Sequence, residues 1–420
     1  MMRYRGKFSR SAYPDIVIYP SDEGKVLDEK WKRWYQLESW KRYGARPTQP
    51  ARLTFSRRLV FHAYLRDAQV SMTQLNNPAM SYAELTLPLP YAKELWFART
   101  AEEFKIRYLE SGAGAAKRLP SLGDLFRDIN ILSAHHHHID VQFSISIYLH
   151  GFWSLIWEHR QLSSIHLPTT SSSTTTALLT SRHHDLTTTL KTFQHLTHTW
   201  NQTHPPHNPH QIPLLSAQET LLLHLLLLNL HVSLPDLQLF SGREGEDQAR
   251  RVYPALQRWA HSPDARIALW HAAQILRAAR SFPRGHLKDF WSVAVCHAGL
   301  VIWAWGVVKQ AANNTGGVVE GGEAGVVVCL DGEETAAVRA WVEYGQGRPV
   351  VCGLDGGGGG SGSGGEYAAS LGDPRACMEV AQEILRANFV GGWEGLPPLS
   401  ENIIVVLKQL EKAALAVGMG

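Results

Sequence analysis

The chain has 420 residues, of which 44% are hydrophobic and 19% are charged, so its length and composition allow a large packed core. Its 41 basic and 38 acidic residues give a net charge of +3, without the basic footprint of a free-standing nucleic-acid binder. The amino-terminal stretch MMRYRGKFSRSAYPDI has no apolar core, which argues against a secretory signal. We therefore expect a soluble intracellular protein.

The cysteines are too widely spaced to predict a disulfide framework, and the absence of any Cys-x-x-Cys pair argues against a cysteine-based zinc site. We expect buried or idle thiols in a reducing compartment. The four positions are Cys296, Cys329, Cys352 and Cys377.

The first helical signals are interrupted. Good helix formers occupy residues 38–42 and 59–72, whereas residues 43–57 contain glycine and two prolines and cannot continue either helix. Residues 43–57 are predicted to form an exposed, poorly packed loop. Trp40 and Phe61, on its two sides, are expected to approach the same core.

Tryptophans and charges in this region favour structural roles over binding. Their helical spacing favours a core stripe over a binding face for Trp31, Trp34 and Trp40. Arg66 and Asp67 lie mid-helix and need partners if they are buried. We prefer an ion-pair network to a ligand site, with plausible partners at Glu38, Arg42 and Arg58.

Further along the chain the signals are mainly helical. Two prolines make residues 85–90 (LTLPLP) an extended connector. The capping sequence Ser262-Pro263-Asp264 predicts a helix that ends near Pro283–Gly285. Residues 290–308 predict a central buried helix, and an apolar stripe after Ser400 predicts a last helix. Leu221–Leu234 is too short and too polar to span a membrane.

The predicted fold class is all-α, a multi-helix domain with long disordered insertions. Composition favours loops or linkers at 316–325 and 355–366, which are rich in glycine. The predicted organisation is a tail (1–29), a first half (30–160), a disordered His/Thr/Ser/Pro-rich insertion (161–215), and a second half (216–415) with the linker at 355–366.

No residue is assigned a catalytic, cofactor-binding or metal-binding role. The run His135–His138, followed by Asp140, belongs to a regional histidine bias, and adjacent histidines point in different directions. The glycines of 356–365 lack the strand and helix of a dinucleotide loop. Because serine-hydrolase, phosphate-loop and zinc-protease motifs are also absent, we predict that the chain is not an enzyme.

Several motifs, in order, resemble the fungal-specific transcription factor regulatory domain, also called the middle homology region. The resemblance covers residues 30–110 and 217–415 and leaves out 161–215. It is closest to the branch usually preceded by two zinc fingers of the two-cysteine, two-histidine type. The motifs are Trp31-Lys-Arg-Trp34, Glu38-Ser-Trp40-Lys-Arg42, LVFHAYLRDAQVSM (59–72), NNPAMSYAELTLPLP (76–90) and ELWFA (94–98).

The resemblance implies a non-catalytic α-helical domain, a nuclear location, and regulation of transcription by RNA polymerase II. It implies transcriptional co-regulators as partners, a possible dimer and no membrane. DNA and zinc would be bound only by fingers, which this chain lacks, so zinc is expected only if fingers are encoded upstream. Either the gene model is truncated at Met1, or the protein is a helical interaction module that has lost DNA binding.

In the family pattern the two helices flanking residues 43–57 follow each other almost directly. The insertion is therefore either a surface loop or a short intron translated by error. We favour the intron.

Overall fold

The structure is a computed structural model that describes residues 16–38, 57–112, 119–165, 173–203, 214–314, 326–353, 368–390 and 395–418. The chain divides into two compact units. Unit 1 comprises Met1–Thr175 and Thr192–Leu214, and unit 2 comprises Thr176–Lys191 and Leu215–Gly420. Helix α8 (Ser173–Thr203) contributes residues to both units.

Unit 1 is helical throughout its described residues, apart from short connections. Its further elements are α1 (Gly24–Glu38), α2 (Arg57–Gln74), the 3₁₀ turn η2 (Tyr82–Glu84), α3 (Lys93–Trp96), α4 (Ala101–Glu110), α5 (Leu122–Arg127), α6 (Ile131–Ala134) and α7 (Val141–Ile165).

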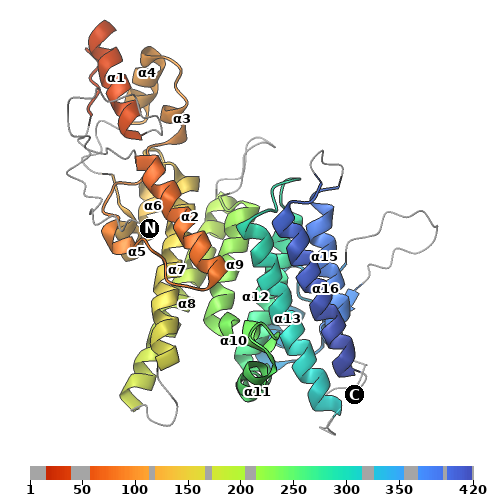
Figure 1. Cartoon of the computed structure of the whole chain (residues 1–420). Helices are drawn as coiled ribbons and strands as arrows, with labels where there is room; N and C mark the ends of the chain where they lie inside the picture. Colours follow the sequence, from red (N-terminus) through yellow and green to blue (C-terminus); the bar gives the residue numbers. More distant parts are fainter. Residues whose placement is uncertain are drawn as a thin grey trace. The chain divides into compact units, whose positions relative to one another are not determined.

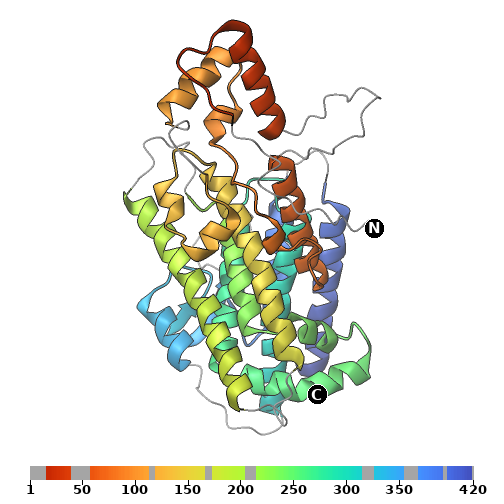
Figure 2. The same cartoon turned by 90° about the vertical axis from the view of Figure 1, so that its left-hand side faces the viewer.

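Helix α1 packs beside α4 through an aromatic core (Figure 2). The ring of Trp34 is buried and lies 4.7 Å from that of Phe104 and 5.6 Å from that of Tyr91. The core role predicted for the tryptophans is thus confirmed for Trp34. Trp31 is only partly buried, and Trp40 lies outside the described residues.

Helix α2 packs against α7, and its buried face carries Phe61, Tyr64 and Met72. Trp153 of α7 donates its indole N–H to the hydroxyl of Ser71 at 2.6 Å. A hydrogen-bonded indole can be buried completely, because its one polar group is satisfied.

Two predicted boundaries at the start of the chain are wrong. Helix α1 begins at Gly24, inside the predicted tail of 1–29, and Leu27 is buried in it. The predicted exposed loop 43–57 lies outside the described residues except for Arg57, which is buried as the first residue of α2. An ionic partner stabilises Arg57 there, as described below.

Residues 173–203, placed by sequence in a disordered insertion, instead form helix α8. A stripe at helical spacing explains the error, because its four side chains are buried within a polar sequence. Threonine hydroxyls on the other faces donate to carbonyls four residues earlier, as from Thr189 to Asp185 at 2.7 Å. The stripe consists of Leu186, Leu190, Phe193 and Thr197.

Unit 2 combines a helical layer with a small sheet. Its elements are α9 (Ala217–His231), α10 (Leu234–Phe240), α11 (Glu246–Ala260), α12 (Pro263–Arg280), α13 (Phe290–Asn314), β1 (Val327–Cys329), α14 (Ala336–Tyr344), β2 (Arg348–Cys352), β3 (Ala368–Ser370), α15 (Pro374–Ala387) and α16 (Pro398–Gly418).

The helical layer is built around α12 and α13, with α9 on one side and α15 and α16 on the other (Figure 1). Alanines such as Ala268 and Ala272 give α12 a smooth buried face, which lets α9 and α13 pack closely. The predicted start of α12 is confirmed, since the Ser262 hydroxyl caps the backbone N–H of Ala265.

The predicted central helix is also confirmed, as α13. Residues Phe290–Ala312 are long and apolar enough to cross a membrane, but 83% of their most apolar 18-residue window is buried within the folded chain. Burial of this kind is typical of a core helix. Trp303 donates its indole N–H to the carbonyl of Leu410 at 2.8 Å, which ties α13 to α16.

The three-stranded sheet was not predicted from sequence. Its order is β1-β2-β3, with β1 and β2 parallel and β2 and β3 antiparallel. Gly347 precedes β2 at φ +102°, where an added Cβ would lie 2.8 Å from the Val326 carbonyl. Only glycine fits this close approach of the two strands. The strands are three to five residues long, too short for a period-of-two signal.

We predict that Gly306→Ala destabilises unit 2 by about 1–3 kcal/mol, because overpacking a core strains the surrounding structure. A Cβ at Gly306 would lie 3.0 Å from both the Leu371 carbonyl oxygen and Pro374 Cβ. Urea unfolding followed by fluorescence measures the change. Gly123→Ala is the matched control, since its Cβ would meet nothing closer than 3.7 Å. Equal stability of the Gly306 variant and the wild type would contradict the packing.

Candidate functional site

A buried charge cluster joins three segments of unit 1. Arg58 places Nη1 2.9 Å from Asp140 Oδ2 and Nε 3.3 Å from Glu38 Oε1, while Arg57 Nη1 lies 3.2 Å from Glu38 Oε2. All four side chains are 10% exposed or less. We call Glu38, Arg57, Arg58 and Asp140 the Arg58 cluster.

The Arg58 cluster also holds the connector at residues 85–91. Tyr91 donates its backbone N–H to Glu38 Oε1 at 3.1 Å, and its carbonyl accepts from Arg58 Nη2 at 2.8 Å. Because Pro88 and Pro90 have no N–H, the connector's hydrogen bonds fall on the residues between and after them. Leu89 accordingly donates to the Pro120 carbonyl at 2.8 Å. The extended conformation predicted for this connector is confirmed.

Electrostatics identify the Arg58 cluster as structural. Burial raises the pKa of Glu38 above its usual value, and Arg57 and Arg58 oppose that rise. Two arginines and two carboxylates balance in charge, so each acid compensates a guanidinium that would otherwise be buried alone. The buried positions leave these groups out of reach of a substrate.

The predicted ion-pair network exists, but not around Arg66 and Asp67. Arg66 is exposed and bonds Gln69 at 3.2 Å, while Asp67 accepts the backbone N–H of Met80 at 2.8 Å. The residues proposed as partners, Glu38 and Arg58, pair with each other, and Arg42 lies outside the described residues.

Sequence reasoning missed two members of the Arg58 cluster, Arg57, which it placed in the loop 43–57, and Asp140. The Asp140 carboxylate also accepts the backbone N–H of Phe143 at 3.2 Å, at the start of α7. The available signal was an aspartate directly before a long apolar helix, which is a typical N-cap position.

The histidine run borders a cavity of about 830 Å³ in unit 1. The rings turn toward local backbone: His135 Nδ1 lies 3.2 Å from the Ile131 carbonyl, and His136 Nδ1 lies 2.7 Å from that of Ser133. The residues that line the cavity are Ala92, Glu94, Leu95, Arg107, Glu110, Ser111 and His136–His138.

In the described part of the chain, two groups of residues bring three potential metal ligands within 4.8 Å of one another, and neither includes the histidine run. The first is His183, His231 and Asp264 in unit 2. His231 Nδ1 lies 2.8 Å from Asp264 Oδ1, and this contact holds the pKa of Asp264 below its usual value. Three ligands are one fewer than a structural zinc site uses.

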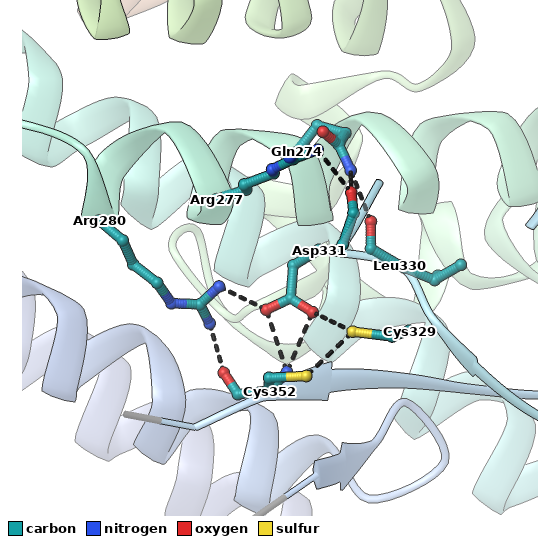
Figure 3. Close-up of polar contacts among 8 residues, drawn as sticks. Gln274, Arg277, Arg280, Cys329, Leu330, Asp331 and Cys352 are labelled. Atoms are coloured by element: carbon teal, nitrogen blue, oxygen red, sulfur yellow. Dashed lines mark hydrogen bonds and ion pairs between the residues drawn. The ribbon is translucent and has the colours of Figure 1, made fainter. Parts of the chain in front are cut away.

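The second group is Cys329, Asp331 and Cys352, beside α12 (Figure 3). The Asp331 side chain is fully buried and lies 2.6 Å from Arg280 Nη1. Both of its oxygens accept the backbone N–H of Cys352 at 3.0 Å, and the Cys329 thiol donates to it at 3.1 Å. Sequence spacing could not reveal this group, because the two cysteines are 23 positions apart.

Comparison with known proteins identifies fungal relatives that are named transcription factors. A transcription factor of Zymoseptoria tritici is 26% identical over 421 residues, covering 93% of this chain and 40% of the relative. Transcription factor 1 of Elsinoe fawcettii is 23% identical, covering 85% and 36%. Transcription factor PfmaH of Pestalotiopsis fici is 21% identical, covering 72% and 30%.

The chain therefore spans well under half the length of these curated relatives. No protein-family profile and no solved structure matches it. The chain is thus similar to fungal proteins that are named transcription factors.

We predict that Arg58→Met costs about 3–5 kcal/mol of unfolding free energy, because it leaves buried carboxylates without their charge partner. Arg66→Met, on the exposed face of the same helix, is expected to change stability by less than about 0.5 kcal/mol. Urea unfolding compares the two.

A double variant tests the pairing itself. Asp140→Asn keeps an oxygen that can cap α7 but removes the charge. Arg58→Met combined with Asp140→Asn should therefore cost less than the sum of the single changes. Simple additivity would show that the two charges are not coupled.

A pH dependence follows from His150, which is buried between Gln69 and the Ser146 carbonyl. Burial lowers its pKa from 6.5 to about 4, so the unfolded chain takes up a proton at a higher pH than the folded chain. Above pH 6.5 the residue is neutral in both states and does not lower the free energy of unfolding. Between pH 6.5 and pH 4 the free energy of unfolding falls by about 1.4 kcal/mol per pH unit because of this residue.

Urea unfolding between pH 7 and pH 4 measures that slope. His150→Gln should make it shallower, whereas His286→Gln, which removes an exposed histidine, should leave it as in the wild type. Parallel curves for the wild type and the His150 variant would rule out this contribution.

Proposed function

We propose that this chain is the regulatory, non-catalytic domain of a fungal nuclear transcription factor that controls transcription by RNA polymerase II. The observation that carries the proposal is the similarity to named fungal transcription factors, which extends along 93% of the chain for the relative from Zymoseptoria tritici. A similarity of that extent includes both units, so it concerns the whole fold and not one motif.

The arrangement of polar groups supports a non-catalytic role. In unit 1 the charged groups of the Arg58 cluster are buried, and they pair with one another and bind backbone groups of neighbouring segments. In unit 2 Asp331 is likewise engaged by Arg280 and by backbone N–H groups. Groups committed in this way position elements of a fold, whereas catalytic groups must reach a substrate.

We infer that this chain does not itself recognise DNA. A net charge of +3 over 420 residues supplies little of the phosphate attraction that dominates DNA affinity. The relatives are more than twice as long as the region they share with this chain, so most of their length has no counterpart in it. The partners proposed for this domain are transcriptional co-regulators.

A tethering experiment tests the proposal. The full 420-residue chain is fused to an unrelated DNA-binding domain and directed to a reporter promoter in fungal cells. We expect reporter messenger RNA to rise or fall relative to the DNA-binding domain alone, and the fusion to lie in the nucleus.

Two variants sharpen the test. Arg66→Met should keep the effect, and Arg58→Met should weaken it in proportion to the loss of folded protein. An unchanged reporter with both an activatable and a repressible promoter, despite normal expression, would refute a regulatory role in transcription.

A further inference from the structure

The pair Cys329 and Cys352 lies at the ends of two adjacent parallel strands (Figure 3). Their sulfur atoms are 2.9 Å apart, and both residues are partly exposed to solvent. We propose that this pair is a redox modification site, where a peroxide oxidises the two thiols to a reversible disulfide. The inference does not depend on the proposed function.

The register of the sheet brings the two thiols together. Val350 of β2 lies opposite Cys329 of β1, and Cys352 is two residues further along β2. Residues two apart on a strand project from the same face, so both thiols lie on one side of the sheet. A disulfide has an S–S bond of about 2.05 Å, so the sulfurs need to approach by roughly 0.9 Å.

The same geometry disfavours a metal ion at this group. Two thiolates bound to one zinc ion at about 2.3 Å keep their sulfurs roughly 3.7 Å apart. The observed separation of 2.9 Å is too small for that arrangement. Asp331, the third potential ligand, is already paired with Arg280 at 2.6 Å, and the guanidinium would repel a cation.

The surroundings tolerate oxidation. In the reduced form the Cys329 thiol donates to Asp331 at 3.1 Å, and that hydrogen bond is lost when the disulfide forms. Asp331 keeps Arg280 and the backbone N–H of Cys352, so no buried charge is left without a partner. The carbonyl of Cys352 also accepts from Arg280, which holds the end of β2 against α12 in either state.

The chemistry balances with peroxide as the oxidant. One sulfur attacks a peroxide oxygen and the O–O bond breaks, which gives a sulfenic acid and one water that carries the thiol proton. The second sulfur then attacks the sulfenic sulfur. The S–S bond forms, the S–O bond breaks, and a second water leaves with the second proton. The thiols lose two electrons, and one peroxide is reduced to two waters.

The reaction should be slow at neutral pH and faster in base. Burial, with a smaller contribution from the Asp331 carboxylate, raises the pKa of the Cys329 thiol. A protonated thiol is a poor nucleophile, so a higher pH increases the reactive fraction. At neutral pH the pair should therefore stay reduced until it meets a strong oxidant.

Peptide mapping of the purified full chain tests the proposal. After peroxide treatment and alkylation, we expect one cross-linked peptide pair containing Cys329 and Cys352, about 2 Da lighter than the sum of the two reduced, unalkylated peptides. Dithiothreitol should restore four alkylatable thiols, since the chain has four cysteines. The oxidised chain should melt about 5–10 °C higher, because the bridge constrains the unfolded state.

Matched variants identify the sulfurs involved. Cys352→Ser should abolish the cross-link and the rise in melting temperature, whereas Cys296→Ser and Cys377→Ser should retain both. Four alkylatable thiols after peroxide, or a cross-link through Cys296 or Cys377, would overturn the proposal. So would protection of the pair from alkylation by zinc ions alone, since that result would identify a metal site.

Discussion

The guanidinium of Arg58 joins segments of unit 1 that are distant in sequence. It contacts the end of α1 through Glu38, the connector through the Tyr91 carbonyl, and the start of α7 through Asp140. A planar group with five N–H donors can satisfy several acceptors at fixed angles, which lysine cannot do. One side chain therefore holds three segments together, and Arg57 adds a second ion pair to Glu38.

Unit 2 contains a similar ion pair, between Arg280 and Asp331. Arg280, the last residue of α12, binds the buried Asp331 and the end of β2. In both units an arginine that pairs with a buried aspartate also donates to a backbone carbonyl of a non-helical segment. Charge pairing supplies direction where the hydrophobic effect, which is not directional, supplies only attraction.

Sequence reasoning succeeded where a local rule decides the structure. The proline content of residues 85–90 and the capping residue Ser262 act within a few positions, and both were interpreted correctly. It failed where long-range contacts decide. The buried stripe of α8 lies in a sequence dominated by threonine and histidine. Its few large side chains show their importance only when neighbouring helices cover them. The strands of the small sheet are too short to show periodicity.

The candidate sites show the same division. Glu38 and Arg58 were named as plausible partners for Arg66 and Asp67, because a buried charge must be paired. Their true pairing required Asp140, which is 82 positions from Arg58. The contact between Cys329 and Cys352 depends on strand register, which no spacing rule predicts. The sequence can thus identify charged residues that need a partner, while the fold determines which residue that partner is.

The dependence of α13 on α16 has a consequence for synthesis of the chain. The indole of Trp303 and the apolar face around it are covered by a helix that begins at Pro398, so the ribosome releases that cover well after α13 itself. Until then the nascent chain exposes a helix with the composition of a membrane span. Unit 2 can therefore complete its core only after α16 has left the ribosome, and a stop codon before α16 would leave α13 available to chaperones or to aggregation.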